Sequence, residues 1–332
     1  MTQEHPFAQY VRIIGKGPNL SRPLTEAEMH QAATMILEGR VEPLQLGAFL
    51  CVLRVRTEVP EEGAGFVRAA RDKLILPDGP PQVDLDWSSY SGKKRQLPWF
   101  LLAALLLAEN GIRICMQGTE GHTPGRIYSR EALQSLGVPI AGSLASAADH
   151  IRAHNFAYVP LEVMSPRLQE IIDLKPVLGL RSPVNTFARM INPFRAPYEI
   201  QTVFHPNYRD VHRETANLLG QRHMAVFKGE GGEAERRPQK PVLVQSLHEG
   251  VLSEEEWPAL MTDEDVKIDE DMNLGRLKAV WRGEDDDAYA TAAVTGTMAI
   301  ALRLMGRAAS PEEAMSLARR MWDERNKERL AA

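Results

Sequence analysis

Between residues 83 and 108 the chain passes from an apolar strand through a polar loop into an apolar helix, and this order limits the folds open to it. Val83 to Asp86 predicts the strand and Leu97 to Ala108 the helix. Such a strand, loop and helix N-terminus build the usual anion site of α/β proteins, because unpaired N–H groups of the helix point into the loop. The loop also carries three consecutive cations at positions 93 to 95. We therefore expect an anion here, and both a small phosphate compound and a polymer backbone remain open.

The alternation of strands and helices continues through the rest of the chain. The strand candidates are Val83 to Asp86, Ile112 to Met116, Tyr158 to Leu161, Ile200 to Phe204, Met224 to Phe227 and Val242 to Gln245. Helical patterns lie between most of them, which favours a mainly parallel sheet covered by helices. Two late helices close the chain, and Ser310 with Pro311 predicts the start of the second.

The segment before the first strand has a different character. Residues 24 to 73 predict three short amphipathic helices, and Thr25 with Glu28 forms a capping box at the start of the first. We therefore expect an α/β protein with a small N-terminal helical domain, residues 1–78, and a large α/β domain with a mainly parallel central sheet, residues 79–332. The helical domain is the candidate dimerisation surface.

Composition excludes several classes of protein. With 332 residues, 44% hydrophobic and 25% charged, the chain has the composition of an ordinary globular protein. The first residues lack a basic region followed by an apolar core, and the most apolar run, Trp99 to Ala108, is shorter than the roughly 20 residues of a membrane span. We expect a cytoplasmic protein with no membrane partner. Cys51 and Cys115 lie in apolar runs and are interpreted as buried thiols.

The charges are distributed unevenly. The net charge is −5, but residues 249–287 hold 14 acidic and 4 basic side chains, so the rest of the chain carries +5. Residues 181–240 hold 10 Lys and Arg against 6 Asp and Glu. A basic surface can therefore coexist with an acidic total, because a polyanion responds to the local field.

Short motifs occur in a fixed order along the chain. The helical segment contains Leu24-Thr25-Glu26-Ala27-Glu28, Ile36-Leu37-Glu38-Gly39, Ala48-Phe49-Leu50 and Leu53-Arg54-Val55-Arg56-Thr57-Glu58; later come Arg181-Ser182-Pro183-Val184-Asn185, Ile191-Asn192-Pro193 and His205-Pro206. From about residue 8 to residue 330 this order resembles the anthranilate phosphoribosyltransferase family. The resemblance implies the nucleoside phosphorylase and phosphoribosyltransferase type of fold.

This chain differs from that family in the motifs that bind the substrate and magnesium. The family wraps the diphosphate of phosphoribosyl pyrophosphate with Gly-Thr-Gly-Gly-Asp, where this chain has Ser88 to Lys93. Its Lys-His-Gly-Asn-Arg is replaced by Met116 to Glu120, and its acidic pair for a second magnesium ion aligns loosely with Gly231 to Glu235, without adjacent carboxylates. Side chains in place of glycines hinder close backbone approach. We assign no catalytic residue, no metal site and no cofactor.

The loop Ser89-Tyr90-Ser91-Gly92-Lys93-Lys94-Arg95 is similar to that of a divergent branch, the YbiB-type proteins. That branch keeps the fold and the dimer and is associated with nucleic-acid binding. The resemblance implies sequence-tolerant DNA or RNA binding by a homodimer that has lost the phosphoribosyl pyrophosphate site. The residues expected to contact nucleic acid are Lys93, Lys94, Arg95, Arg181, Arg189, Arg195, Arg236 and Arg237. Those expected to line an anion or ligand pocket are Ser88, Ser91, Gly92, Gly118, Thr119 and Asn185.

Each of these assignments has an alternative. Arg181 stands just before a helix start, where the cation and the helix dipole both attract an anion, but it could equally be a surface arginine paired with an acid. The three loop cations could be a solvated charge run. A phosphoribosyl or other glycosyl transferase with a changed substrate, using Mg²⁺, is the alternative function. A scaffold whose dimer surface is the functional part is a third.

Overall fold

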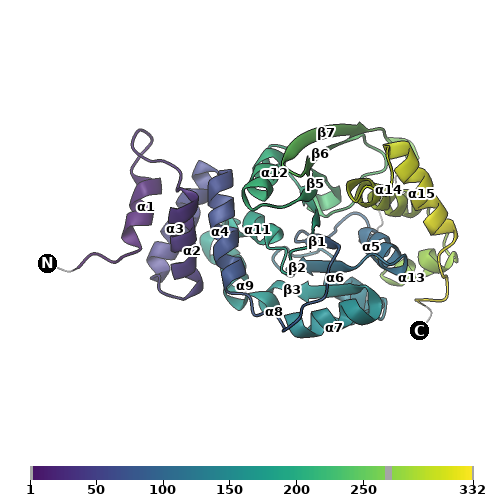
Figure 1. The fold of residues 1–332 in the computed structure, drawn as a ribbon, viewed down its shortest axis with the longest axis horizontal. Helices are drawn as coiled ribbons and strands as arrows, with labels where there is room; N and C mark the ends of the chain where they lie inside the picture. The colour runs from purple at the N-terminus through teal and green to yellow at the C-terminus, as the bar shows by residue number, and fades with distance from the viewer. Residues whose placement is uncertain (1–2, 266–270, 331–332) are drawn as a thin grey trace.

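The helical N-terminal part stands beside the α/β body along the long axis of the molecule (Figure 1). The structure, a computed structural model, describes residues 3–265 and 271–330. The N-terminal helices are α1 (Ala8–Gly15), α2 (Glu26–Leu37), α3 (Pro43–Arg56) and α4 (Pro60–Asp72). The capping box of α2 is confirmed, since Thr25 Oγ1 accepts from the Glu28 N–H at 3.2 Å and the Glu28 carboxylate accepts from the Thr25 N–H at 2.9 Å.

Seven strands form one sheet in the order β3-β2-β1-β4-β5-β6-β7. They are β1 (Leu85–Ser89), β2 (Ile114–Gly118), β3 (Phe156–Pro160), β4 (Tyr198–Val203), β5 (His223–Lys228), β6 (Val242–His248) and β7 (Val251–Trp257). The first five are parallel to one another, and β6 and β7 are antiparallel to their neighbours. The predicted mainly parallel sheet is confirmed, and each predicted strand overlaps an observed one.

Strand β7 was missed by the sequence prediction. It lies inside the acidic segment 249–287, and the residues Glu254 to Glu256 lie on it. The strand is at the edge of the sheet, where charged side chains are favoured because they discourage pairing with other chains. A high density of acidic residues in this segment therefore does not exclude a strand. Residues 266–270 of the same segment lie outside the described residues.

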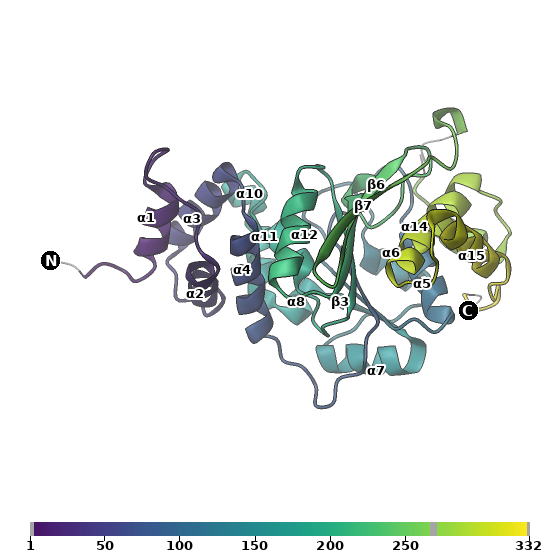
Figure 2. The ribbon, with the colours of Figure 1, turned by 45° about the horizontal axis from the view of Figure 1, so that its top comes forward.

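Helices cover both faces of the sheet. They are α5 (Phe100–Glu109), α6 (Ser129–Ser135), α7 (Leu144–His154), α8 (Leu161–Met164), α9 (Pro166–Asp173), α10 (Lys175–Leu178), α11 (Val184–Phe187), α12 (Tyr208–Leu218), α13 (Gly275–Arg282), α14 (Ala288–Leu304) and α15 (Pro311–Asp323), with 3-10 turns at Ala188–Met190, Glu230–Gly232 and Asp263–Asp265. Helix α12 lies on the face turned toward the N-terminal helices, and α14 and α15 lie on the other (Figures 1 and 2).

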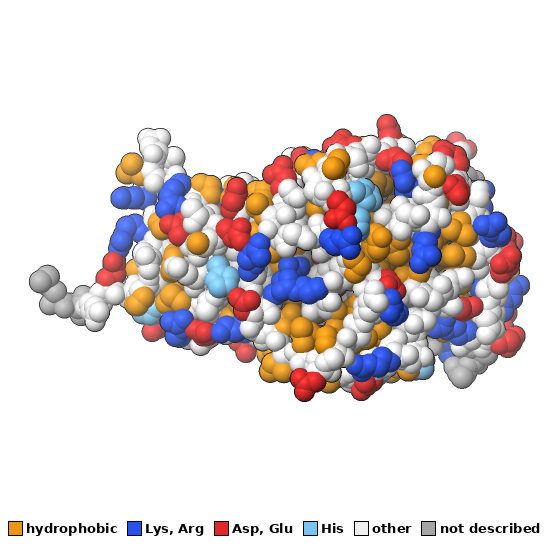
Figure 3. Space-filling model, viewed as in Figure 1, with side chains coloured by type: hydrophobic (Ala, Val, Ile, Leu, Met, Phe, Trp, Pro, Cys, Tyr) orange, Lys and Arg blue, Asp and Glu red, His pale blue; other side chains and the backbone are white. Residues whose placement is uncertain are grey.

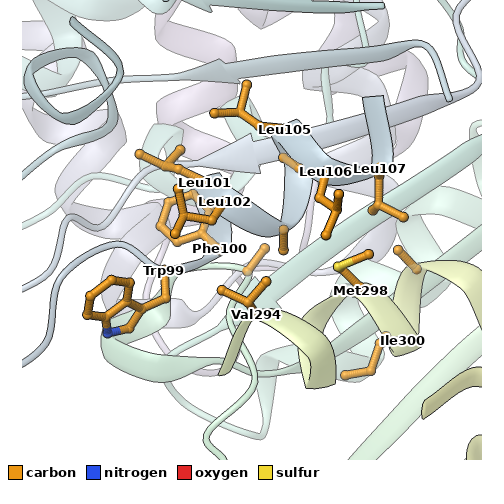
Figure 4. Packing of buried hydrophobic residues seen from close by; sticks show 14 of the residues in the cluster. Trp99, Phe100, Leu101, Leu102, Leu105, Leu106, Leu107, Val294, Met298 and Ile300 are labelled. Carbon is orange, nitrogen blue, oxygen red and sulfur yellow. The ribbon is translucent and has the colours of Figure 1, made fainter. Parts of the chain in front are cut away.

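The most apolar helix, α5, is packed inside the body rather than exposed. All residues from Phe100 to Ala108 are buried. Figure 4 shows Leu102, Leu106 and their neighbours facing Val294 and Met298 of α14. No helix in the described part of the chain combines the length and apolar character needed to cross a bilayer.

A second hydrophobic core joins the N-terminal helices to the α/β body. Phe66 of α4 and Phe187 of α11 have ring centroids 5.1 Å apart. Arg71 donates from Nε to the Ile191 carbonyl at 2.7 Å and from Nη2 to the Met190 carbonyl at 3.1 Å. The predicted domain boundary at 78/79 falls in residues 73–84, which hold no helix or strand, yet the core continues across it.

Two carboxyl groups face each other within the central sheet. Asp86 of β1 pairs in register with Glu199 of β4, and both side chains are buried. Burial raises the pKa of Glu199 to about 7, and the nearby Arg71 guanidinium opposes that shift. Burial and the neighbouring Glu199 also raise the pKa of Asp86. The pair therefore holds protons in the folded state that it would release when unfolded at neutral pH.

This pair predicts a specific pH dependence of stability. A raised folded-state pKa contributes stability that is present below the unfolded pKa of about 4.5 and is lost as the pH rises through about 7. Glu199→Gln imitates the neutral carboxyl group at every pH. We expect the melting temperature of Glu199→Gln, relative to wild type, to rise by roughly 5 °C between pH 5 and pH 8. The buried histidines change stability with pH in the opposite sense, so the measured quantity is the difference in melting temperature between Glu199→Gln and wild type. A difference that does not change with pH would contradict the prediction.

Candidate anion-binding site

Two loops meet above the carboxyl ends of the central strands. Residues 90–95 follow β1, and residues 229–235 follow β5. The backbone N–H groups of Ser91 and Gly92 both donate to Oε1 of Glu233, each at 2.6 Å. Two adjacent backbone N–H groups form the kind of concave donor site that binds phosphates and other anions. In this chain its own carboxylate fills that site.

A second carboxylate from the same loop binds next to it. The Glu235 side chain forms a buried ion pair with Lys93 and accepts the backbone N–H of Phe100, the first residue of α5, at 2.9 Å. Burial raises the pKa of Glu235 to about 7, and the Lys93 ammonium opposes the shift. The helix N-terminus predicted to attract an anion therefore also has an internal partner. We call Glu233 and Glu235 with their contacts the carboxylate clasp.

A small cavity lies beside the clasp, between the helical domain and the α/β domain. Its volume is about 90 Å³. It is lined by Arg54, Ser91, Arg181, Ser182, Asn185, Thr186, Arg189, Thr202, Val203, Phe204, His205, Tyr208 and His212. Arg189 donates to Ser91 Oγ at 2.8 Å, and its guanidinium stands 5.4 Å from the ring centre of Tyr90. Burial lowers the pKa of His212 to about 3, so its imidazole is neutral at pH 7.

Two further cations, Arg126 and Lys175, lie near Arg181 of the cavity lining. We call these three residues the cation cluster. They donate only to backbone carbonyls and a threonine hydroxyl, for example Lys175 Nζ to the His122 carbonyl at 2.8 Å and Arg181 Nη2 to Thr123 Oγ1 at 2.9 Å. Burial and the neighbouring cations lower the pKa of Lys175 and of Arg181. Among the described residues, none of the three has a carboxylate within ion-pair distance. The cluster is therefore a region of positive charge without an internal counter-charge.

The exposed loop cations extend the cluster outward. Lys93 forms an isolated antiparallel bridge with Ile127, with hydrogen bonds of 2.7 and 2.8 Å between their backbones. This register sets Lys94 opposite Arg126, and both Lys94 and Arg95 are exposed. The surface beside the cavity thus carries cations on two chain segments that are about thirty residues apart.

The structure divides the residues predicted to contact nucleic acid. Lys94, Arg95 and Arg181 belong to this surface. Lys93 and Arg236 are buried, 1% and 0% exposed, so the expectation that they contact a polymer is wrong. Lys93 is held by Glu235, and the Arg236 guanidinium packs 5.3 Å from the ring centre of Trp257.

The other three predicted contacts also have different surroundings. Arg189 is buried and can meet only a ligand inside the cavity, so its place in a polymer-binding surface is wrong. Arg237 lies 3.5 Å from Glu230 in an ion pair. Arg195 is exposed but precedes β4, at the opposite edge of the sheet.

The predicted pocket residues are also only partly brought together. Ser91 and Asn185 line the cavity, and Gly92 supplies one N–H of the clasp. Ser88, Gly118 and Thr119 lie outside its lining. Gly118 instead allows close strand packing, since a Cβ there would lie 2.0 Å from the Ser89 carbonyl oxygen, and Thr119 Oγ1 donates to Gln169 at 2.6 Å. Sequence reasoning missed Arg54, Arg126 and Lys175 as site residues. Arg54 lies in the quoted motif Leu53 to Glu58, whereas no local motif contains Arg126 or Lys175.

Comparison with known proteins agrees with this architecture. Two family models match the chain: the helical bundle domain of the glycosyl transferase family at residues 8–74 and its a/b domain at residues 100–324. The chain is 26% identical to the anthranilate phosphoribosyltransferase of Moorella thermoacetica over 307 residues, 89% of this chain and 88% of that protein. It is 25% identical to the uncharacterized protein YbiB of Escherichia coli (strain K12) over 239 residues, 70% of this chain and 74% of that protein. The crystal structure of anthranilate phosphoribosyltransferase from Thermus thermophilus matches with a TM-score of 0.77 at 21% identity, covering 99% of this chain and 100% of that chain.

The clasp predicts that removing Glu233 opens an anion site. In Glu233→Ala the N–H groups of Ser91 and Gly92 lose their acceptor and are free for a phosphate oxygen. We expect inorganic pyrophosphate, at ten times its Kd for this variant, to raise the melting temperature of the variant by about 3 °C more than that of wild type. Glu233→Gln is the matched control, because its amide oxygen can still accept both N–H groups. An equal response of the Ala and Gln variants would contradict the prediction.

Proposed function

The chain belongs to the glycosyl transferase family whose helical bundle and a/b domains it matches, and from that premise we propose that it binds nucleic acid through phosphates, without sequence preference. The observation that carries the proposal is the cation cluster. The charges of Arg181 and Arg126 lower the pKa of Lys175, and the charge of Arg126 lowers the pKa of Arg181, in both cases in addition to burial. No carboxylate pairs with any of the three among the described residues. A phosphate backbone supplies the missing negative charges at regular spacing.

The carboxylate clasp argues against phosphoribosyl pyrophosphate as the ligand. Glu233 occupies the donor site formed by Ser91 and Gly92, and a diphosphate would have to displace a buried carboxylate to reach it. The adjoining cavity of about 90 Å³ is also small beside the roughly 300 Å³ or more of usual small-molecule pockets. An anion that stays at the rim avoids both obstacles.

The exposed loop favours a polymer over a single phosphate. Lys94 and Arg95 extend the charge beyond the cavity rim, and both are exposed and lack a partner among the described residues. Successive phosphates of one strand could contact both this loop and the inner cluster. Contacts of this kind read charge and spacing and do not read bases.

We further propose that the protein acts as a homodimer through its helical domain. Leu44 and Val55 of α3 are 88% and 81% exposed, which is unusual for large apolar side chains and typical of an interface. Two cation clusters on one particle would raise avidity for a long strand without new contacts. Light scattering coupled to size exclusion should give twice the chain mass of 37.1 kDa, and Leu44→Glu with Val55→Glu should give the monomer mass. A monomeric wild type would remove the dimer from the proposal.

A transferase acting on a small anion is the second candidate, and one observation favours it. The cavity brings Arg181 and Arg189 together with the neutral His212, a set that could hold a small anionic substrate. This candidate predicts that phosphoribosyl pyrophosphate with Mg²⁺ raises the melting temperature of wild type. Arg181→Ala or removal of Mg²⁺ should abolish that effect.

The nucleic-acid proposal is tested by salt-dependent binding of a labelled single strand of about 30 nucleotides, measured by fluorescence anisotropy. The triple variant Arg126→Ala, Lys175→Ala, Arg181→Ala should bind more weakly. The slope of log K against log salt should fall in magnitude by about 2, since each lost phosphate contact on a single strand contributes about 0.7.

The control is a triple variant with the same change in net charge, Arg307→Ala, Arg319→Ala, Arg320→Ala. These three exposed cations lie near the C-terminus and outside the cluster. We expect wild-type slope and affinity from the control. No binding by wild type at low salt, or equal slopes for the two triple variants, would overturn the proposal.

A further inference from the structure

A second and larger cavity lies at the opposite edge of the sheet, where β4 and β5 begin. Its volume is about 460 Å³, within the range of ordinary small-molecule sites. Strands β4 to β7 form its floor, and the C-terminal end of α14 forms one wall. Figure 3 shows hydrophobic side chains gathered on this face near histidine side chains. The cation cluster is at the carboxyl edge of the sheet, so the two sites are separate.

Aromatic and aliphatic side chains form most of this cavity. The rings of Tyr198 and His223 stack with centroids 4.7 Å apart and planes 17° from parallel. Trp257 lies on β7, and Ile300 and Leu304 face the cavity from α14. Flat rings beside aliphatic side chains favour a flat ligand with an apolar body.

Unused polar groups lie on the floor of the cavity. Ser246 of β6 and Ser253 of β7 are directly paired across the two strands, and both line the cavity. Neither hydroxyl has a hydrogen-bond partner among the described residues. A serine hydroxyl can donate and accept, so the pair can bind a ligand edge that carries both kinds of group.

The charges that face the cavity cancel. Glu255 accepts from Arg303 Nη2 at 3.3 Å and from Trp257 Nε1 at 3.0 Å. Burial lowers the pKa of His223 and of His248, so both imidazoles are neutral at pH 7.

The second acid of the lining, Glu254, has its partners on the other face of the sheet. The Glu254 carboxylate accepts from Gln245 at 2.7 Å and lies 3.5 Å from Arg213 of α12, which covers the other face of the sheet. An anionic ligand would therefore meet Glu255, and a cationic one would meet Arg303, without a free counter-charge in either case.

We infer that this cavity binds a neutral, flat ring compound with an amide or lactam edge. The ring would lie among Tyr198, Trp257 and Ile300, and the edge would exchange hydrogen bonds with Ser246 and Ser253. The site does not depend on nucleic-acid binding, because it shares no residue with the cation cluster.

The test uses benzamide, benzoate and benzamidine, three probes of nearly equal shape that differ in charge. Binding to the full chain is measured by ligand-observed NMR and by thermal shift. We expect benzamide to bind at least tenfold more tightly than either charged probe. Equal binding of the three probes, or preference for a charged one, would overturn the inference.

Two variants locate the site. Ser246→Phe fills the floor of the cavity and should abolish benzamide binding, whereas Ser253→Ala removes one hydroxyl and should weaken it about fivefold. Ser253→Ala keeps the test valid if Ser246→Phe fails to fold, and unchanged affinity in Ser253→Ala would contradict the proposed edge contacts. The triple variant of the cation cluster should bind benzamide as wild type does, and loss of binding there would show that the probe uses the other site.

Discussion

The carboxylate clasp is the interaction on which the arrangement of the carboxyl edge depends. Glu233 holds the backbone of Ser91 and Gly92, and Glu235 holds Lys93 and the first N–H of α5. The two loops follow strands that are not neighbours in the sheet, since β4 lies between β1 and β5. The clasp therefore spans the central strand and fixes the loop after β1 in one position. Breaking a buried pair by removing one partner is strongly destabilising, so the alternative positions of this loop are unfavourable.

The clasp also decides which cations can act outside the molecule. Lys93 forms a buried ion pair with Glu235. Only the next two cations of the loop, Lys94 and Arg95, are therefore exposed to solvent. The Arg189 guanidinium interacts electrostatically with Glu233 and donates a hydrogen bond to Ser91 Oγ. These two contacts hold the Arg189 side chain inside the cavity. A loop that looks uniformly basic in the sequence is thus divided by folding into an internal part and an external part.

The sequence predicted the features that depend on neighbours along the chain. The cap of α2 at Thr25 and that of α15 at Ser310 are both present, and the alternation of apolar strands and helices gave the parallel sheet. The ion pair of Lys93 and Glu235 joins residues 142 positions apart, and no local pattern links them. The same holds for Arg126, which reaches the site from the loop before α6, and for Lys175, the first residue of α10. Strand β7 escaped prediction because its edge position tolerates a run of glutamates.

The contrast between two groups of cations supports an external anion. Three of the four buried cations have carboxyl groups near them: Glu235 beside Lys93, Glu233 near Arg189, and Asp86 with Glu199 near Arg71. The fourth, Arg236, packs against the Trp257 ring and donates to the Pro258 carbonyl. Burying a charge without such a partner is costly, which explains the pattern. The cation cluster is partly buried and mutually repulsive, yet its partners among the described residues are neutral oxygens. We therefore propose that an anion from outside the molecule balances the charge of the cation cluster. Phosphates approaching the rim would relieve the repulsion that the cluster retains in the free protein.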